Sequence, residues 1–149
     1  MPINECCNIG VVCCEADTLL PEVAELMRKH HVGDVVVIDD REGGRIPLGI
    51  VTDRDIVIET VALKLDSNVF TAGDIMAVPL VTVHEDEGFV ETLRLMRNHK
   101  IRRLPVVTRA GTLFGIVTAD DIVNLLAYEL SLLTGAIVAQ PAEEGRLRR

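Results

Sequence analysis

The stretch Gly49-Ile-Val-Thr-Asp-Arg-Asp-Ile56 occurs twice in this chain with small changes. The second copy, Gly115-Ile-Val-Thr-Ala-Asp-Asp-Ile122, begins 66 residues after the first. In each copy a β-branched Ile-Val pair suits a strand, and Thr followed three residues later by Asp has the spacing of a helix capping box. Each copy, called here the first or second phrase, therefore predicts a strand that runs directly into a helix.

The repetition extends well beyond the two phrases. Met27-Arg-Lys-His30 matches Met96-Arg-Asn-His99 at an offset of 69 residues, and Val36–Ile38 matches Pro105–Val107 at the same offset. The change from 69 to 66 falls between Asp39 and Leu48, where the first repeat carries three more residues than the second. Because hairpin loops tolerate insertions, we expect the longer hairpin in the first repeat.

Both repeats predict the same order of elements: strand, helix, strand, strand, helix. Apolar residues at i, i+4 and i+7 indicate the first helix of each repeat, as in Leu20, Ala24 and Met27. The helix that opens with the first phrase is expected to run from Asp53 to about Leu65, and the last helix from Ala119 to about Ala139. The predicted strands are Val11–Cys14, Val35–Ile38 and Pro47–Val51 in the first repeat, and Leu80–Val83, Leu104–Val107 and Leu113–Val117 in the second.

This pattern resembles the tandem cystathionine-β-synthase-like (CBS) domain pair. The two phrases, the two Met-Arg-x-His helix ends and the strand Arg102–Val107 carry the resemblance, which covers about Pro2 to Leu133. It implies an α+β fold in which two β-α-β-β-α repeats pack as one pseudo-two-fold module. We expect the first repeat with its lead-in segment at 1–66, the second repeat at 71–133, and a helix end with a disordered tail at 134–149.

The resemblance also implies a function, because many members of the family are regulatory modules that bind AMP, ATP, NAD or S-adenosylmethionine. The family assigns ligand contacts to the Thr and Asp of each phrase, here Thr52, Asp55, Thr118 and Asp121. The first turn of a helix offers free N–H groups and the positive end of its dipole, and a carboxylate can accept hydrogen bonds from both hydroxyls of a ribose. A Thr-x-x-Asp sequence is equally a helix cap by itself, so both interpretations stay open.

Two sites are expected, and they differ in charge. Arg102 and Arg103 suit a phosphate group, whereas Asp34 stands at the position equivalent to Arg103 and would repel one. We therefore expect a phosphorylated ligand, AMP above all, at the second site. The residues assigned to the second site are Thr82, Ile101, Arg102, Arg103, Leu104, Pro105, Thr118 and Asp121, and those assigned to the first are Cys13, Val32, Gly33, Asp34, Thr52, Arg54 and Asp55.

No nucleophile–base arrangement, Gly-rich phosphate loop or metal-ligand pattern is recognisable in the sequence. We therefore predict a regulatory module without catalytic activity or a required cofactor, which signals to an unknown effector protein. The alternative is a structural or protein-interaction pair with empty sites that acts through dimerisation. A metal- or thiol-dependent sensor is a third hypothesis, because Cys6-Cys7 and Cys13-Cys14 form two vicinal pairs. Free Cys residues commonly behave as small buried hydrophobes, and we expect that role here.

The composition of the chain limits the kinds of partner that it can bind. The chain has 149 residues, a net charge of −8 and an aromatic content of 3%, which argues against general nucleic-acid binding. No signal peptide is visible, and no apolar stretch approaches the roughly 18 residues that span a bilayer, so we expect a cytoplasmic protein without a membrane partner. The broad apolar face from Ile122 to Ile137 predicts a homodimer.

Overall fold

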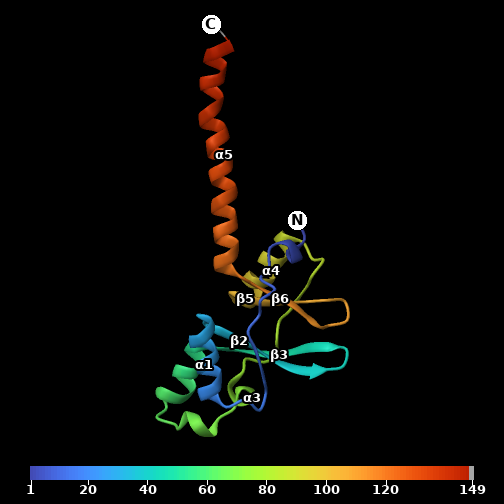
Figure 1. Cartoon of the computed structure of the whole chain (residues 1–149), viewed down its shortest axis with the longest axis vertical. Helices are drawn as coiled ribbons and strands as arrows, with labels where there is room; N and C mark the ends of the chain where they lie inside the picture. The colour runs from blue at the N-terminus through green and yellow to red at the C-terminus, as the bar shows by residue number, and fades with distance from the viewer. Residues whose placement is uncertain (148–149) are drawn as a thin grey trace.

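Two three-stranded sheets form the centre of the protein (Figure 1). The computed structural model describes the backbone of residues 1–147 and the side chains of residues 1–138. In each sheet a short first strand pairs in parallel with the second strand, which forms an antiparallel hairpin with the third. The strands are β1 (Cys13–Glu15), β2 (Asp34–Arg41) and β3 (Gly44–Thr52), then β4 (Val83–His84), β5 (Arg103–Val107) and β6 (Leu113–Thr118). The predicted α+β fold of two equivalent repeats is confirmed.

The helices α1 (Leu20–His30) and α4 (Phe89–His99) occupy equivalent places in the two repeats. Each is followed by a residue in the left-handed conformation, His31 at φ 53° and Lys100 at φ 54°. The helix of the first phrase is shorter than predicted: α2 (Asp53–Ile56) continues only as a π-helical turn, η2 (Val57–Val61). Lys64, at φ 58°, also lies in the left-handed region, which a right-handed helix cannot accommodate.

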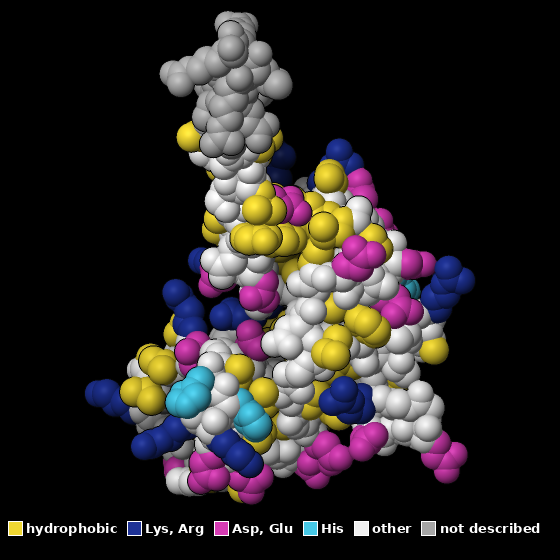
Figure 2. All heavy atoms as spheres, turned by 45° about the horizontal axis from the view of Figure 1, so that its top comes forward, with side chains coloured by type: hydrophobic (Ala, Val, Ile, Leu, Met, Phe, Trp, Pro, Cys, Tyr) yellow, Lys and Arg dark blue, Asp and Glu magenta, His cyan; other side chains and the backbone are white. Residues whose placement is uncertain are grey.

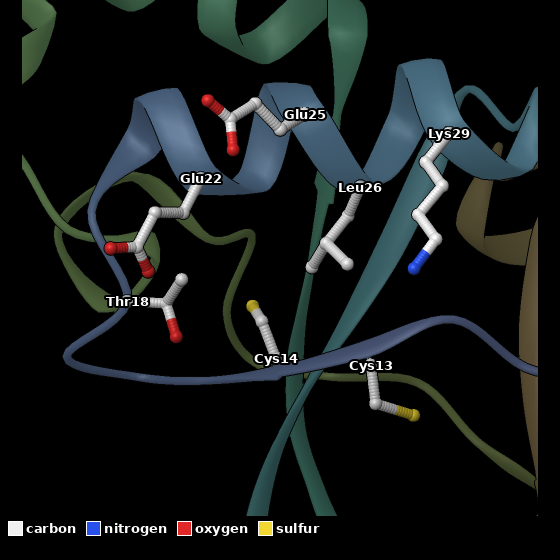
Figure 3. A pocket seen from close by; sticks show the side chains of 7 residues that line it. All are labelled: Cys13, Cys14, Thr18, Glu22, Glu25, Leu26 and Lys29. Carbon is white, nitrogen blue, oxygen red and sulfur yellow. The ribbon is translucent and has the colours of Figure 1, made fainter.

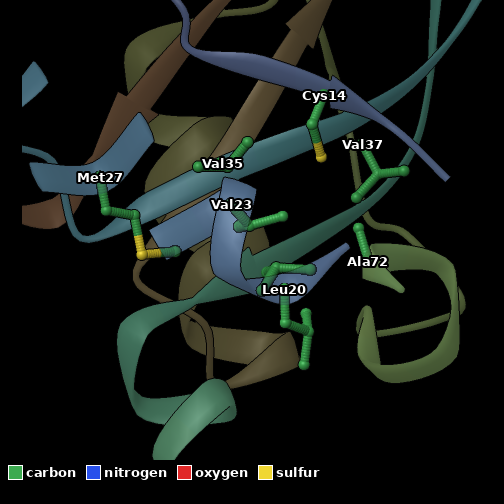
Figure 4. Packing of buried hydrophobic residues seen from close by; sticks show 8 residues of the cluster. Cys14, Leu20, Val23, Met27, Val35, Val37 and Ala72 are labelled. Atoms are coloured by element: carbon green, nitrogen blue, oxygen red, sulfur yellow. The ribbon is translucent and has the colours of Figure 1, made fainter. Parts of the chain in front are cut away.

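Each repeat has its own hydrophobic core between its sheet and its first helix. In the first repeat Leu20 and Val23 of α1 pack against Val35 and Val37 of β2 (Figure 4). In the second repeat Met96 packs with the strand residues Leu104, Val106 and Val117. A third cluster joins the two sheets and is formed by the buried side chains Val36, Ile38, Ile50, Leu113 and Ile116. The two repeats therefore share buried surface, as expected for one module.

The segment that precedes each repeat packs against the other repeat. Ile3, in the short 3-10 helix η1 (Ile3–Glu5), is fully buried in the second core, and Asn8 exchanges two backbone hydrogen bonds of 2.9 Å with Ile116. The linker helix α3 (Ala72–Ile75) places Ala72 in the first core, and the N–H of Ala77 donates to the carbonyl of Ile50 at 3.0 Å. Each lead-in segment therefore belongs to one repeat by its place in the sequence and to the other repeat by its packing.

This exchange explains the glycine that opens each phrase. A Cβ at Gly115 would lie 2.8 Å from the carbonyl oxygen of Asn8 and 2.8 Å from the Cys7 sulfur. A Cβ at Gly49 would lie 2.7 Å from the sulfur of Met76. These distances are shorter than van der Waals contact, so the close approach of the Asn8 backbone requires glycine at position 115, and a side chain at position 49 would displace that of Met76.

The last helix, α5 (Ala119–Leu147), projects from the rest of the molecule as a long rod (Figure 1). It does not end near Ala139, so the prediction of a disordered tail from residue 140 is wrong as far as Leu147; residues 148 and 149 lie outside the described residues. Figure 2 shows hydrophobic side chains gathered where α5 leaves the two repeats. Most side chains along the rod are exposed, including those of Leu126, Leu130 and Leu133.

The length and composition of α5 also correct the expectation that no apolar stretch is long enough to span a bilayer. The 20 residues Ala119–Val138 have a mean hydropathy of 1.5, and 6% of this stretch is buried. By length and composition alone the stretch is sufficient to cross a bilayer. Asp120, Asp121 and Glu129 interrupt its apolar run, which is why an inspection for uninterrupted apolar residues does not detect it.

Candidate functional site

The Thr and Asp of the first phrase form a helix cap between β3 and α2. The N–H of Asp55 donates to the Thr52 hydroxyl at 3.1 Å, and the N–H of Thr52 donates to Oδ2 of Asp55 at 2.9 Å. These reciprocal bonds are a complete capping box. They fix the carboxylate at the rim of the helix N-terminus while Oδ1 of Asp55 takes no part in the box.

Related helix caps occur at two other places. In the second phrase the N–H of Asp121 donates to the Thr118 hydroxyl at 3.1 Å. Thr71 and Asp74, in the linker between the repeats, form another complete capping box, which the sequence interpretation missed although Thr71-Ala-Gly-Asp74 has the same spacing. Capping is therefore a general role of Thr-x-x-Asp in this chain, and only its surroundings can make one copy a ligand site.

A pocket of about 160 Å³ lies beside the first phrase. Thr52 and Asp55 form one wall together with Ile50, and the opposite wall comes from the second repeat, where Arg102 and Arg103 lead into β5. The pocket is lined by Ile50, Thr52, Asp55, Ala77, Ile101, Arg102 and Arg103. Thr52, Asp55 and two arginines thus line one pocket together with apolar residues, which is the usual composition of a small-molecule site.

This arrangement differs from the predicted grouping of residues. The sequence interpretation placed Ile101, Arg102 and Arg103 with Thr118 and Asp121, within one repeat. The structure brings all three to the pocket of Thr52 and Asp55, and it also places Arg102 and Arg103 beside Thr118, because the start of β5 faces the first repeat. Repeats that meet across a shared interface combine residues from both halves, which an alignment of the halves cannot reveal.

A smaller cavity of about 80 Å³ lies beside Thr118. Arg102 and Arg103 line it as well, but here they face carboxylates. Nε of Arg103 lies 2.5 Å from Oδ2 of Asp34, and Nη2 of Arg102 lies 2.9 Å from Oδ1 of Asp120. The two arginines therefore separate a pocket with one carboxylate from a cavity with two.

The other predicted site residues lie further from the two cavities. Leu104 and Pro105 are buried among the strands, and Leu104 has no exposed surface. The carbonyl of Gly33 accepts the N–H of Asp53 at 3.0 Å, as that of Arg102 accepts the N–H of Ala119 at 2.8 Å. Arg54 is exposed, Val32 is half-buried beyond the end of α1, and Thr82 immediately precedes β4.

Two larger cavities lie elsewhere. One, of about 410 Å³, is lined by four acidic residues, Glu15, Asp17, Asp39 and Asp40, together with Ala16, Ile38 and Leu48. The other, of about 460 Å³, lies between α1 and β1 (Figure 3) and is lined by Cys13, Cys14, Thr18, Glu22, Glu25, Leu26 and Lys29. Neither places two guanidiniums beside a Thr-Asp pair, and carboxylates repel an anionic ligand. The smaller pocket beside the first phrase is therefore the candidate site.

The cysteines are free thiols in this structure. Burial raises the pKa of Cys14 to about 11, and burial also raises the pKa of Cys13, partly offset by the Arg45 guanidinium. At neutral pH both groups are protonated, which makes them weak nucleophiles and poor metal ligands. Figure 3 shows Cys13 and Cys14 pointing to opposite sides of the strand, and within the described part of the chain no three His, Cys, Asp or Glu side chains cluster as a metal site.

A family model described as CBS domain matches residues 3–61 and 72–128. The chain belongs to the CBS-domain family. Both matches include one of the two phrases, and together they cover most of the chain. The resemblance deduced from the repeated phrases is confirmed.

Two relatives and one solved structure are similar to this CBS pair over most of its length. It is 41% identical over 107 residues to the uncharacterized protein MK0525 of Methanopyrus kandleri, covering 72% of this chain and 53% of that one, so it spans about half of that relative. It is 37% identical over 119 residues to hypoxic response protein 1 of Mycobacterium tuberculosis, covering 80% of each chain. The crystal structure of Hypoxic Response Protein I with two coordinated zinc ions matches with a TM-score of 0.71 at 35% identity, covering 83% of this chain and 98% of that one.

A further solved structure contains ligands. The CBS domain pair of protein MJ0100, in complex with 5-methylthioadenosine and S-adenosyl-L-methionine, matches with a TM-score of 0.73 at 26% identity. The match covers 85% of this chain and 99% of that one. CBS pairs of this shape therefore include one that binds adenosine derivatives.

Proposed function

We propose that this CBS pair is a regulatory module that binds an adenine nucleotide, with AMP as the favoured ligand, in the pocket between the first phrase and the start of β5. The observation that carries the proposal is the convergence of Asp55 with Arg102 and Arg103 in one pocket. The complex of the MJ0100 pair with adenosine derivatives supports the same ligand class.

Each part of AMP has a counterpart in the pocket. The free Oδ1 of Asp55 and the second lone pair of Oδ2 can accept from the ribose hydroxyls while the cap remains formed. Ile50, Ala77 and Ile101 supply apolar surface for the adenine ring, and the guanidiniums of Arg102 and Arg103 can bind the phosphate through two N–H groups each. S-adenosylmethionine and methylthioadenosine lack a phosphate, so two arginines favour AMP over them.

Calorimetry tests this proposal directly. We expect AMP to bind more tightly than adenosine, S-adenosylmethionine or NAD, and to raise the midpoint of thermal unfolding, because a ligand that binds only the folded state stabilises it. A chain that binds none of these compounds would instead fit a structural or interaction module with empty sites. Elemental analysis of the same sample examines the remaining hypothesis of a metal-dependent sensor.

We also propose that the protein is a cytoplasmic homodimer rather than a membrane protein. Glu129 lies at the middle of the apolar stretch Ala119–Val138, and an acidic residue at the centre of a bilayer costs about 2.5–3.5 kcal/mol. On α5 the side chains of Leu126, Leu130, Leu133 and Ile137 are exposed and follow one another at spacings of three and four residues, which places them on one face. A second copy of the chain would remove this face from water.

Sedimentation should therefore give twice the 16.3 kDa mass of the chain at micromolar concentration. Leu133→Glu should shift the protein toward the monomer, because it puts a charge into the apolar face. Ser131→Glu adds the same charge on another side of α5 and should leave the mass unchanged. A wild-type mass near that of one chain would contradict the homodimer.

A further inference from the structure

Asp34 and Arg103 occupy equivalent positions in the two repeats. Asp34 begins β2 and pairs with Thr52 of the first phrase, and Arg103 begins β5 and pairs with Thr118 of the second phrase. Their side chains meet between the repeats, with Nε of Arg103 2.5 Å from Oδ2 of Asp34. Equivalent positions of two repeats meet where the repeats face each other across a two-fold axis. Two arginines at this place would repel, so the difference between the repeats creates the ion pair.

The same difference makes the two cavities electrically unequal. The pocket beside Thr52 is lined by one acidic residue, Asp55, and by Arg102 and Arg103. The cavity beside Thr118 contains two carboxylates, from Asp34 and Asp120, beside the same two guanidiniums. A phosphate placed in the second cavity would face both carboxylates at close range, which disfavours its binding. Of these two cavities, the pocket beside Thr52 is the one suited to a phosphorylated ligand.

Arg103 forms the ion pair with Asp34 and is also the proposed partner of the ligand phosphate. The Asp34 side chain is 17% exposed and that of Arg103 is 36% exposed, whereas the Arg102–Asp120 pair is 73% and 79% exposed. Solvent weakens an exposed ion pair, so the partly shielded Arg103–Asp34 pair is the stronger competitor. The pocket volume of about 160 Å³ is also below the roughly 300 Å³ at which ligand sites usually begin, so a nucleotide enters only when the arginines move.

We infer that this chain has one phosphate-accepting nucleotide site, beside Thr52 and Asp55, and that Asp34 lowers its affinity by competing with the ligand phosphate for Arg103. The inference rests on the proposed adenine-nucleotide function. It assigns Asp34 a role opposite to that of a ligand contact. Binding of the phosphate exchanges one partner of Arg103 for another and thereby breaks a contact between the two repeats.

Asp34→Asn tests the inference because it removes the competing charge and preserves the size of the side chain. Calorimetry with AMP should give one site per chain in the wild type and an affinity roughly three- to tenfold higher in the variant. Adenosine lacks the phosphate, and its affinity should stay within about twofold. Asp86→Asn is the matched control, since Asp86 forms an exposed ion pair with Arg109 and its loss changes the net charge equally.

A charge exchange provides a second test. In the double variant Asp34→Arg with Arg103→Asp, the pocket beside Thr52 gains a carboxylate and loses an arginine, whereas the cavity beside Thr118 keeps two carboxylates, so AMP affinity should fall and no new AMP site should appear. Unchanged AMP affinity in Asp34→Asn, or two equal AMP sites in the wild type, would overturn the inference and leave the proposed function standing. Absence of binding by AMP and adenosine to the wild type and to Asp34→Asn would overturn both.

Discussion

Asp55→Asn is expected to weaken AMP binding more than tenfold while the protein stays folded. If Asp55 holds the ribose, the substitution removes the charge from two hydrogen bonds. Bonds to a charged group contribute about 1.5–3 kcal/mol each, and about 1.4 kcal/mol corresponds to a factor of ten in affinity. The amide oxygen of Asn can still accept the N–H of Thr52, so the capping box, whose bonds measure 2.9 and 3.1 Å, is retained.

Two variants separate ribose binding from capping. Asp74→Asn makes the same change in the capping box of the linker, and Asp121→Asn makes it at the start of α5. Both should leave AMP affinity nearly unchanged. Calorimetry should also show weaker binding of 2′-deoxy-AMP by the wild type, because one hydroxyl is missing. Equal affinity for AMP and 2′-deoxy-AMP would show that Asp55 does not bind the ribose and acts only as a cap.

Arg103→Ala is expected to reduce AMP affinity by about ten- to a hundredfold, which follows from the loss of one or two charge-assisted bonds to phosphate. Adenosine should lose much less. The ratio of the two affinities is the informative quantity, because the variant also leaves Asp34, whose side chain is 17% exposed, without its partner. Thermal unfolding should therefore show some loss of stability in the same variant.

The control for this prediction is Arg109→Ala, which removes an exposed arginine that pairs with Asp86. It should change neither affinity. The double variant Arg103→Ala with Asp34→Asn removes the unpaired carboxylate and should regain stability without regaining AMP affinity. Equal losses for AMP and adenosine in Arg103→Ala would mean that the guanidinium does not contact the phosphate.

Local patterns in the sequence predicted the elements and the family of this protein. The strand-to-helix transition at Thr52 follows from a β-branched pair and a capping residue, and the helix α1 follows from the spacing of Leu20 and Met27. Such signals depend on residues within a few positions of one another, so they can be interpreted without knowledge of the rest of the chain. Recurrence of the phrase at Gly115 then identified the two repeats and the resemblance to CBS pairs.

Contacts between distant residues were decided by the tertiary structure alone. The sequence offered Arg103 as a phosphate group's partner and Asp34 as its counterpart in a separate site, and only the packing of the two sheets through Val36, Ile50 and Ile116 brought both into one ion pair. The lead-in segment likewise crosses to the second repeat, where Ile3 is fully buried in the core. An alignment of two repeats shows which positions are equivalent, whereas the interface between them determines which positions touch.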